Sequence, residues 1–506
     1  MKTEMTMMVA LAAASAFAGV HNVKLDTSAD RVESPLRVNM TRIGTIRPRG
    51  VNEIHGQNWR LGCEILDRDY MNFDEYKEHV APLGIKLVRL QGGWAKCEKE
   101  KGKYDFAWLD HIVDYLKAQG VEAAIETSYG NPIYKGGGTI DLAAGFPTSE
   151  EGLAGWDAWV DALTRHFKGR VSNWLMWNEP DIKPHDGSAM KTPEQIAAFN
   201  VRTAKIVKES IPDARIAGLS LASCKSELLE QCLAAMGADV KLFDWIIYHG
   251  YAAAPEQSYA EVEKQKAVLA KYNPAARMWQ GENGCPSEMA TRFALSGVPW
   301  SEYSQAKWDM RRMLGDLGHD VESSVFTICD FNHTGREINL KGLLRADENR
   351  DVIAVKRAYY AVQNVVSVFD DTVVRVKDSC YEKGFGSKDP TLVTYAYEKD
   401  GAKPIFVFWR AGEVERNRKT ADLLPDGLGF GVKWQRPGDS FATAPTVFRY
   451  TGAPLKEPVW VDLLTGRVYA FPPAKQVCTA GVVRFLDVPV YDSPCLLAEK
   501  SALQLQ

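Results

Sequence analysis

Two glutamates in the sequence have neighbours that suit catalysis. Glu179 stands in the segment Trp-Asn-Glu-Pro-Asp, and Glu282 stands in the segment Trp-Gln-Gly-Glu-Asn. A pair of carboxyl groups can divide the breaking of a bond, because one protonates the leaving group while the other attacks as a nucleophile or activates water. The two residues are far apart in the sequence. This chemistry therefore requires a fold that brings two distant segments together.

An alternation of short β-rich runs with amphipathic stretches predicts eight strand–helix units between about residues 59 and 367. Eight such units are typical of a (β/α)₈ TIM barrel. An open doubly wound sheet would need a glycine-rich phosphate turn, which the sequence lacks. The predicted strands are Trp59–Leu66, Lys86–Gln91, Glu122–Ser128, Asn173–Glu179, Arg215–Ala222, Phe243–Gly250, Arg277–Gly284 and Ser324–Asp330. The predicted helices are Phe73–Leu83, Ala107–Gln119, Glu150–Phe167, Pro193–Ser210, Lys225–Met236, Tyr259–Tyr272, Glu302–Leu317 and Val352–Val368.

After residue 369 the pattern changes to short strands separated by glycine, proline and aspartate, which predicts a C-terminal β-sandwich. The expected strands there are Thr372–Val376, Leu392–Tyr397, Pro404–Phe408, Thr446–Tyr450, Val459–Leu463, Val468–Phe471 and Val482–Val488. We therefore predict an α/β chain with a catalytic barrel at 51–368 and a β-sandwich at 369–506. Residues 19–50 are strand-like and form a candidate N-terminal segment of the sandwich.

The first 18 residues have the pattern of a signal peptide. An apolar, alanine-rich stretch runs from Met7 to Phe17, and Ala16-Phe17-Ala18 provides a cleavage site. No later apolar run is long enough to span a membrane. We therefore expect an exported protein, periplasmic or secreted, with no membrane span; the sequence does not indicate an oligomeric state.

The composition of the chain limits the kinds of molecule that it is expected to bind. The formal net charge of −4 and the absence of a lysine- or arginine-dense run disfavour nucleic acid and favour neutral or weakly polar ligands. Nine cysteines include no Cys-x-x-Cys pair, and no His-x-His or carboxylate–histidine cluster is apparent at the predicted strand ends. Neither a metal nor a cofactor is expected.

The active site of a TIM barrel lies at the C-terminal ends of its strands. Those positions hold carboxylates, amides, one arginine and several aromatic residues, a composition suited to sugars. Aromatic faces can stack on the CH groups of a pyranose, and polar groups can bind its hydroxyls. The selected residues are Glu64, Arg89, Gln91, Trp94, Tyr129, Asn131, Trp177, Asn178, Glu179, His249, Tyr251, Trp279, Glu282, Asn283, Asp330 and His333.

An Asn-Glu-Pro at the end of the fourth strand, with a second glutamate ending the seventh, resembles clan A of the glycoside hydrolases. Family 39, the β-xylosidase and iduronidase group, is among the most similar, and other bacterial β-glycosidases and β-glucanases share the pair. The resemblance implies that Glu179 is the acid/base, Glu282 the nucleophile, and Asn178 the group that binds the sugar 2-hydroxyl. It also implies that Arg89 lies near the nucleophile and that His249 or Tyr251 fills the aromatic hydrogen-bonding position.

The predicted substrate-binding set is Asn178, Arg89, His249, Tyr251, Trp94, Asn131 and Trp279. One departure from the clan is the eighth strand, where many members place a tryptophan and this chain reads Thr-Ile-Cys-Asp-Phe-Asn-His at 327–333. Trp279 or Trp300 is a candidate replacement for that tryptophan.

The sequence thus predicts a retaining glycoside hydrolase that cleaves β-linked, equatorial bonds. Retention needs two carboxyl groups about 5–5.5 Å apart, whereas inversion needs roughly 6.5–9.5 Å. An inverting hydrolase and a catalytically inactive carbohydrate-binding barrel remain as alternatives. The presence of both carboxylates argues against the inactive protein.

Overall fold

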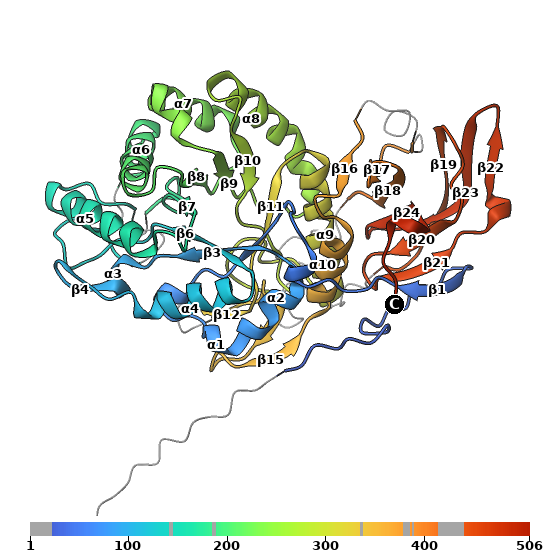
Figure 1. The fold of residues 1–506 in the computed structure, drawn as a ribbon, viewed down its shortest axis with the longest axis horizontal. Helices are drawn as coiled ribbons and strands as arrows, with labels where there is room; N and C mark the ends of the chain where they lie inside the picture. The colour runs from blue at the N-terminus through green and yellow to red at the C-terminus, as the bar shows by residue number, and fades with distance from the viewer. Residues whose placement is uncertain are drawn as a thin grey trace, which may run out of the picture.

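The computed structural model describes residues 23–140, 145–184, 189–333, 337–377, 385–386, 389–412 and 440–506. Figure 1 shows a barrel of strands and helices, coloured blue to yellow, beside antiparallel sheets coloured orange to red. The predicted signal peptide at 1–18 lies outside the described residues.

The barrel is a closed ring of eight parallel strands, which confirms the predicted fold. Around the ring the order is β2, β3, β6, β7, β8, β9, β10 and β11. Most of these strands end earlier than predicted, because their last residues leave the ladder to form the loops above the barrel. Their bounds are Trp59–Gly62, Leu87–Gln91, Glu122–Glu126, Asn173–Leu175, Arg215–Leu221, Trp245–Tyr248, Arg277–Gln280 and Glu322–Val325.

Helices follow the strands and cover the outside of the barrel (Figure 1). Three of them, α5, α6 and α8, have the predicted bounds. Helix α6 begins at Pro193 because the Thr192 side chain accepts a hydrogen bond from the Gln195 backbone and the Gln195 side chain caps Thr192 in return. The helices are α1 Phe73–Tyr76, α2 Val80–Leu83, α3 Trp94–Cys97, α4 Ala107–Ala118, α5 Glu150–Phe167, α6 Pro193–Ser210, α7 Ser226–Met236, α8 Tyr259–Tyr272, α9 Glu302–Gly318 and α10 Arg357–Val368.

The last predicted helix, Val352–Val368, is wrong in its first turn. Strand β15 (Val352–Val355) pairs antiparallel with β14 (Leu344–Ala346), and α10 begins only at Arg357. The segment Val-Ile-Ala-Val is rich in β-branched residues, which suit a strand better than the start of a helix. Two further hairpins pair β4 (Glu98–Glu100) with β5 (Lys103–Tyr104), and β12 (Phe331–His333) with β13 (Glu337–Asn339).

The C-terminal region consists of a seven-stranded and a three-stranded antiparallel sheet. In the larger sheet the order is β1-β21-β20-β24-β18-β17-β16, and in the smaller it is β19-β23-β22. Strand β1 brings the N-terminal segment into the larger sheet by pairing with β21. Their bounds are β1 Thr41–Thr45, β16 Val373–Arg375, β17 Leu392–Lys399, β18 Lys403–Arg410, β19 Ala444–Thr451, β20 Pro458–Asp462, β21 Arg467–Ala470, β22 Gln476–Thr479, β23 Val482–Val490 and β24 Cys495–Glu499.

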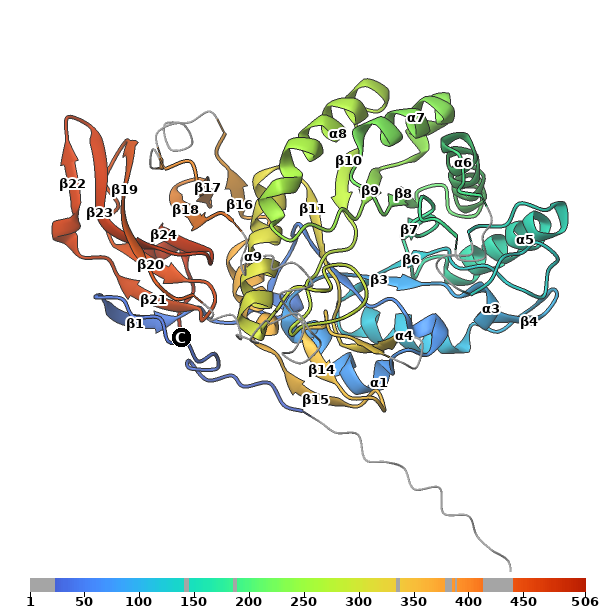
Figure 2. The same cartoon turned by 180° about the vertical axis from the view of Figure 1, so that it is seen from behind.

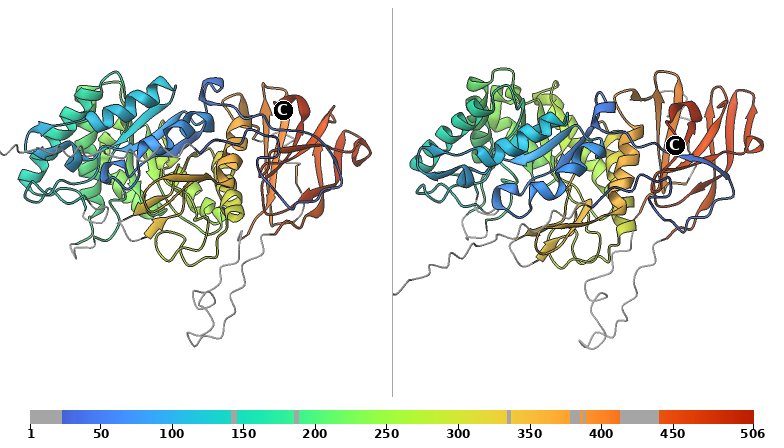
Figure 3. Two further views of the ribbon diagram at one scale, coloured as in Figure 1. Left: turned by 90° about the horizontal axis from the view of Figure 1, so that it is seen from below. Right: turned by 60° about the horizontal axis from the view of Figure 1, so that its bottom comes forward.

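The larger sheet packs on both faces. One face shares a continuous hydrophobic core with the barrel, and the other packs on the smaller sheet through an aromatic core. Figures 2 and 3 show α9 and α10 between the barrel and the sheets. Polar links cross the same junction, because Trp409 Nε1 donates to Glu256 Oε1 at 2.6 Å and Lys307 pairs with Asp492 at 2.8 Å. The sheets therefore brace one side of the barrel.

Within the described ranges, every helix is too short or too polar to cross a lipid bilayer.

Candidate active site

The C-terminal ends of the barrel strands open into a pocket of about 630 Å³. That volume is in the range of sites for small ligands. The pocket is lined by both glutamates singled out in the sequence and by residues of seven strand–helix loops. The lining residues used below are Glu64, Arg68, Gln91, Tyr129, Asn178, Glu179, Tyr251, Glu282, Phe293, Phe326, Phe331, His333, Asn339 and Lys341.

Glu179 follows β7 and is held in an unusual backbone conformation. Its φ is +49°, a left-handed value that glutamate seldom adopts, and its N–H donates to Ser220 O at 2.9 Å. Burial raises the pKa of Glu179 to about 8, and the negative charge of Asp181 adds to the effect, against the opposing influence of Arg89. Glu179 is therefore protonated at neutral pH, as a general acid must be.

Glu282 follows β10 and has the surroundings of a carboxylate. Tyr251 donates its hydroxyl to Oε2 at 3.2 Å, and Arg89 Nη1 donates to Oε1 at 3.4 Å. An oxygen of Glu179, an oxygen of Glu282 and a nitrogen of His249 all lie within 4.8 Å of one another. The fold thus brings the two carboxyl groups together over one pocket.

Arg89, on β3, lies beneath this pair and is fully buried among three carboxyl groups. It pairs with Glu126 at 2.7 Å, with Glu64 at 3.1 Å and with Glu282 at 3.4 Å. It also donates to Asn178 Oδ1. The Asn178 amide is fixed from both sides, because its Nδ2 donates to Tyr129 Oη at 2.8 Å. This network orients the strand-end residues before any ligand arrives.

His249 lies at the end of β9, between the two glutamates. Its Nδ1 is 2.7 Å from Glu179 Oε1 and 3.4 Å from Glu282 Oε2. Burial lowers the pKa of His249 to about 4, so the ring is neutral at pH 7. A neutral ring with its proton on Nδ1 can donate to these carboxyl oxygens.

Glu179, His249 and Glu282 also form a carboxylate–histidine cluster, which the sequence analysis did not anticipate. Their spacing would suit a metal ion. The buried Arg89 cation already pairs with Glu282. A second cation there would meet electrostatic repulsion, so we interpret the group as an acid and a nucleophile bridged by a histidine.

Two predicted binding residues, Trp94 and Asn131, do not line the pocket. Trp94 is buried in α3, stacked against Tyr134 and Trp159, and its Nε1 donates to Glu98 Oε2 at 2.6 Å. Asn131 donates to the backbone oxygen of Glu98 at 2.9 Å. Both residues are correctly placed near strand ends, but they hold loops together instead of facing the ligand.

Trp279, the third such residue, points into the barrel below the pocket. It packs with Leu87 and Ile247 in the barrel interior, and its Nε1 donates to Ser324 Oγ at 2.7 Å. Trp300 is buried in a separate cluster. Phe326 and Phe331, beside the eighth strand, line the pocket where either tryptophan was expected.

The sequence analysis missed two cationic residues of the pocket wall. Arg68 lies in the loop after β2, and Lys341 lies between β13 and β14. Both stand beyond the strand ends, in loops whose path no local pattern predicts. The strand-end rule could therefore not select them.

The sequence of the barrel was compared with models of known protein families. Residues 63–280 match the model of glycosyl hydrolases family 39. Most of the barrel is thus similar to this family. The match confirms the resemblance to clan A indicated by the two glutamate motifs.

Curated relatives match short segments. The β-galactosidase BbgII of Bifidobacterium bifidum is 36% identical over 73 residues, which are 13% of this chain and 10% of that protein. The β-galactosidase BgaA of Clostridium cellulovorans is 35% identical over 51 residues, which are 10% of this chain and 8% of that protein. The chain thus spans about a tenth of the length of either relative.

Solved structures match most of the fold. A family 39 glycoside hydrolase from Bacteroides cellulosilyticus WH2 has a TM-score of 0.58 at 16% identity, covering 88% of this chain and 81% of that one. A monomeric β-xylosidase from Caulobacter crescentus CB15 has a TM-score of 0.54 at 16% identity, covering 90% of this chain and 97% of that one. At this identity the likeness concerns the fold alone.

Proposed function

We propose that this protein is a retaining glycoside hydrolase that cleaves β-linked glycosidic bonds. The observation that carries the proposal is the approach of one oxygen of Glu179 and one of Glu282 to within 4.8 Å. Retaining enzymes place their carboxyl groups about 5–5.5 Å apart, whereas inverting enzymes leave roughly 6.5–9.5 Å for a water molecule. The β-linkage is supported by the family 39 match and by the names of the curated relatives.

In the first step Glu179 donates its proton to the glycosidic oxygen while a Glu282 oxygen attacks the anomeric carbon. The bond from that carbon to the leaving oxygen breaks, the alcohol departs, and a glycosyl ester forms on Glu282. Arg89 and Tyr251 hold the attacking carboxylate in place. The Asn178 amide, fixed by Arg89 and Tyr129, is suited to bind the sugar 2-hydroxyl.

In the second step the charge states of Glu179 and Glu282 are exchanged. Ester formation removes the negative charge of Glu282, and Glu179 has become a carboxylate by giving up its proton. Glu179 can therefore take a proton from water as the water oxygen attacks the anomeric carbon. The ester bond breaks, Glu282 leaves as a carboxylate, and the product keeps the β configuration.

The test is an assay of the purified protein on a panel of aryl β-glycosides and polysaccharides, beside Glu179→Ala and Glu282→Ala. We expect Glu282→Ala to lose at least about 10³-fold in kcat/KM. Azide should restore turnover of activated substrates by Glu179→Ala and give a β-glycosyl azide. Glu230→Ala, on the outer surface of α7, is the matched control and should keep full activity.

Other outcomes would favour the alternatives. Initial release of the α-anomer by the unaltered protein, followed by NMR, would indicate inversion, and loss of activity with a chelator would indicate a metal at Glu179, His249 and Glu282. If no substrate is turned over and polysaccharide binding is unchanged in both variants, the barrel is a binding protein.

We also propose that the protein is exported to the periplasm or the medium, on the basis of the leader-like residues 1–18. N-terminal sequencing of protein from the producing cell should begin at Gly19. An unprocessed N-terminus in the cytoplasmic fraction would contradict export.

A further inference from the structure

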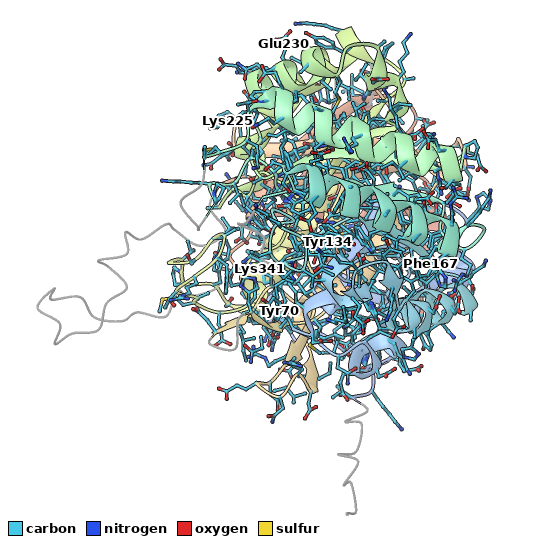
Figure 4. The ribbon with its side chains drawn as sticks, turned by 90° about the vertical axis from the view of Figure 1, so that its left-hand side faces the viewer. Tyr70, Tyr134, Phe167, Lys225, Glu230 and Lys341 are labelled. Carbon is cyan, nitrogen blue, oxygen red and sulfur yellow. The ribbon has the colours of Figure 1, made fainter. Side chains whose placement is uncertain are left out.

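Lys341 is a buried cation on the wall of the pocket. It is 2% exposed and lies between β13 and β14. Its backbone oxygen accepts hydrogen bonds from Gln305 Nε2 at 3.2 Å and from the Thr327 N–H at 3.3 Å, so the residue is fixed in place. Figure 4 shows Lys341 and Tyr70 on the same side of the molecule.

The positive charge of the Lys341 ammonium group has few partners. Within the described part of the chain it donates one long hydrogen bond, to Asn339 Oδ1 at 3.4 Å, and no carboxylate oxygen lies within 4.0 Å. Its other neighbours are the rings of Tyr251 and Phe293, each 5.9 Å away. Burial lowers the pKa of Lys341 to about 8, which leaves most of the group charged at neutral pH.

Two other buried lysines show what this chain does when a lysine is structural. Lys307 pairs with Asp492 at 2.8 Å and donates to Ser440 O at 2.6 Å. Lys356 pairs with Asp330 at 2.6 Å and donates to Ser287 Oγ at 2.9 Å. A buried charge is costly unless paired. Lys341 differs from both in facing a pocket, where an anion can enter.

Two further nitrogen groups line the same wall. Arg68 donates to Gln91 Oε1 at 2.7 Å and lies over the rings of Tyr70 and Tyr129. Its charge is partly balanced by Asp67, at 3.3 Å. The buried Nδ1 of His333 has no hydrogen-bond partner among the described residues.

We propose that this wall, made by Arg68, His333 and Lys341, is a subsite for a negatively charged group on the substrate sugar. The group is a carboxylate, as in a uronic acid, or a sulfate ester; both accept hydrogen bonds from cations. The inference rests on the proposed glycosidase function and names its substrate class. A chain with a net charge of −4 can still concentrate cations on one wall.

A competing role for Lys341 is to support the nucleophile. Glu282 is near enough to raise the pKa of Lys341, but its oxygens lie beyond 4.0 Å from Nζ. Glu282 also has closer partners in Arg89, Tyr251 and His249. The lysine is therefore free to bind a ligand.

The experiment compares matched substrates that differ in one charged group. The pairs are 4-nitrophenyl β-glucuronide with β-glucoside, β-galacturonide with β-galactoside, and a 6-sulfated β-glycoside with its unsulfated parent. The protein, Lys341→Met, Lys341→Arg and the control Lys307→Met are assayed on each pair, and the readout is the ratio of kcat/KM for the charged over the neutral member. The uronate and sulfate arms distinguish the two kinds of anion.

We expect one arm to show a charged-over-neutral ratio well above one. Lys341→Met should lower that ratio at least about tenfold, the size of one lost hydrogen bond between charged groups. Lys341→Arg should retain more of it than Lys341→Met, and Lys307→Met should leave it unchanged. A ratio at or below one in every arm, or equal losses on both members of a pair in Lys341→Met, would overturn the proposal.

A binding measurement separates this inference from the proposed function. Calorimetry with free glucuronate, galacturonate, glucose and glucose 6-sulfate needs no turnover. Preferential binding of an anionic sugar that Lys341→Met removes would support the subsite even if no glycoside is hydrolysed. Turnover of neutral glycosides without any preference for anions would leave the glycosidase standing and remove the subsite.

Discussion

The barrel mouth and the C-terminal sheets bury carboxyl groups in different ways. Asp462, at the end of β20, accepts hydrogen bonds from Tyr491 Oη and Thr465 Oγ1, both at 2.6 Å, and from the Leu464 N–H at 3.3 Å. Glu64, above β2, is as deeply buried and lies 3.1 Å from Arg89, but neither of its oxygens accepts a well-oriented hydrogen bond within the described residues. A satisfied buried carboxylate supports a fold, whereas an unsatisfied one at a pocket marks a place where a ligand or a proton can bind.

The two regions also differ in what surrounds such groups. Between the two C-terminal sheets the core is aromatic, with Phe385 stacked on Phe406 at 4.1 Å and on Phe448 at 4.8 Å. The barrel mouth instead concentrates several buried carboxyl groups around one guanidinium, that of Arg89. One region gains stability from packing, and the other holds charges at a cost to stability because chemistry needs them.

The largest effect should come from Arg89→Met. Without the guanidinium, Glu64, Glu126 and Glu282 lose their shared buried partner. We expect about 3–5 kcal/mol less free energy of unfolding and at least about 10³-fold lower kcat/KM. Urea unfolding measures the free energy of unfolding, and steady-state kinetics measure kcat/KM. Arg165→Met, on the surface of α5, is the control. Wild-type activity in Arg89→Met would show that the network does not position the site.

The pH dependence of turnover tests Glu179 directly. Because Glu179 must carry a proton and its pKa is about 8, kcat/KM should fall about tenfold per pH unit above pH 8. The measurement uses an uncharged aryl glycoside with a poor leaving group between pH 6 and 10. A dinitrophenyl glycoside, which needs no protonation on departure, should not show this fall. A flat alkaline profile with the poor leaving group would contradict the assignment.

Asp462→Ala tests the other region. The substitution leaves two buried hydroxyls without their acceptor, so we expect a loss of about 2–4 kcal/mol in the free energy of unfolding. The kcat/KM of the folded protein should not change, since the residue lies in the C-terminal sheets. Urea unfolding measures the loss of stability, and steady-state kinetics measure kcat/KM. Glu457→Ala, an exposed carboxylate of the same region, should change neither. A large loss of kcat/KM with intact folding would link the sheets to the site.

Much of the fold was predictable because its periodicity is local. All eight barrel strands and the helices α5, α6 and α8 have clear patterns in the sequence. Strand β24 was missed because Cys-Leu-Leu-Ala-Glu is buried through four consecutive residues and so has no alternation. Strand β15 was mistaken for the start of the last helix for the converse reason, because an apolar run can satisfy either period.

The sequence predicted the residues of the site that stand at the ends of the barrel strands, but not those that stand in the loops beyond them. Glu179, Glu282, Asn178, Arg89, His249 and Tyr251 all come together at the pocket or beneath it. Trp94 and Trp279 stand at strand ends too, but the direction of a side chain depends on tertiary packing, and both rings point into the core. Lys341 reaches the pocket from a loop, so its role depends on a path that only the folded chain reveals.

The smallest effect should come from Glu64→Gln, which keeps the shape of the side chain and removes its charge. Burial raises the pKa of Glu64 to about 8, and the negative charges of Glu282 and Glu126 add to this against Arg89. The raised value means that folding favours the neutral form. This contribution is present below the ordinary pKa of a glutamate and is lost as pH rises toward 8. Between pH 6 and 9 the wild type should therefore lose about 2–3 kcal/mol more free energy of unfolding than Glu64→Gln.

Urea unfolding at pH 6, 7, 8 and 9 measures this difference, with Glu230→Gln on the surface of α7 as the control that keeps the wild-type slope. Glu179 is present in all three proteins, so its own titration cancels. If Glu64→Gln has the wild-type slope, Glu64 is ionised beside Arg89, 3.1 Å away, throughout this range. Glu64 beside Arg89 would then resemble Asp462 with its hydrogen-bond donors: a buried carboxylate whose partners let it support the fold.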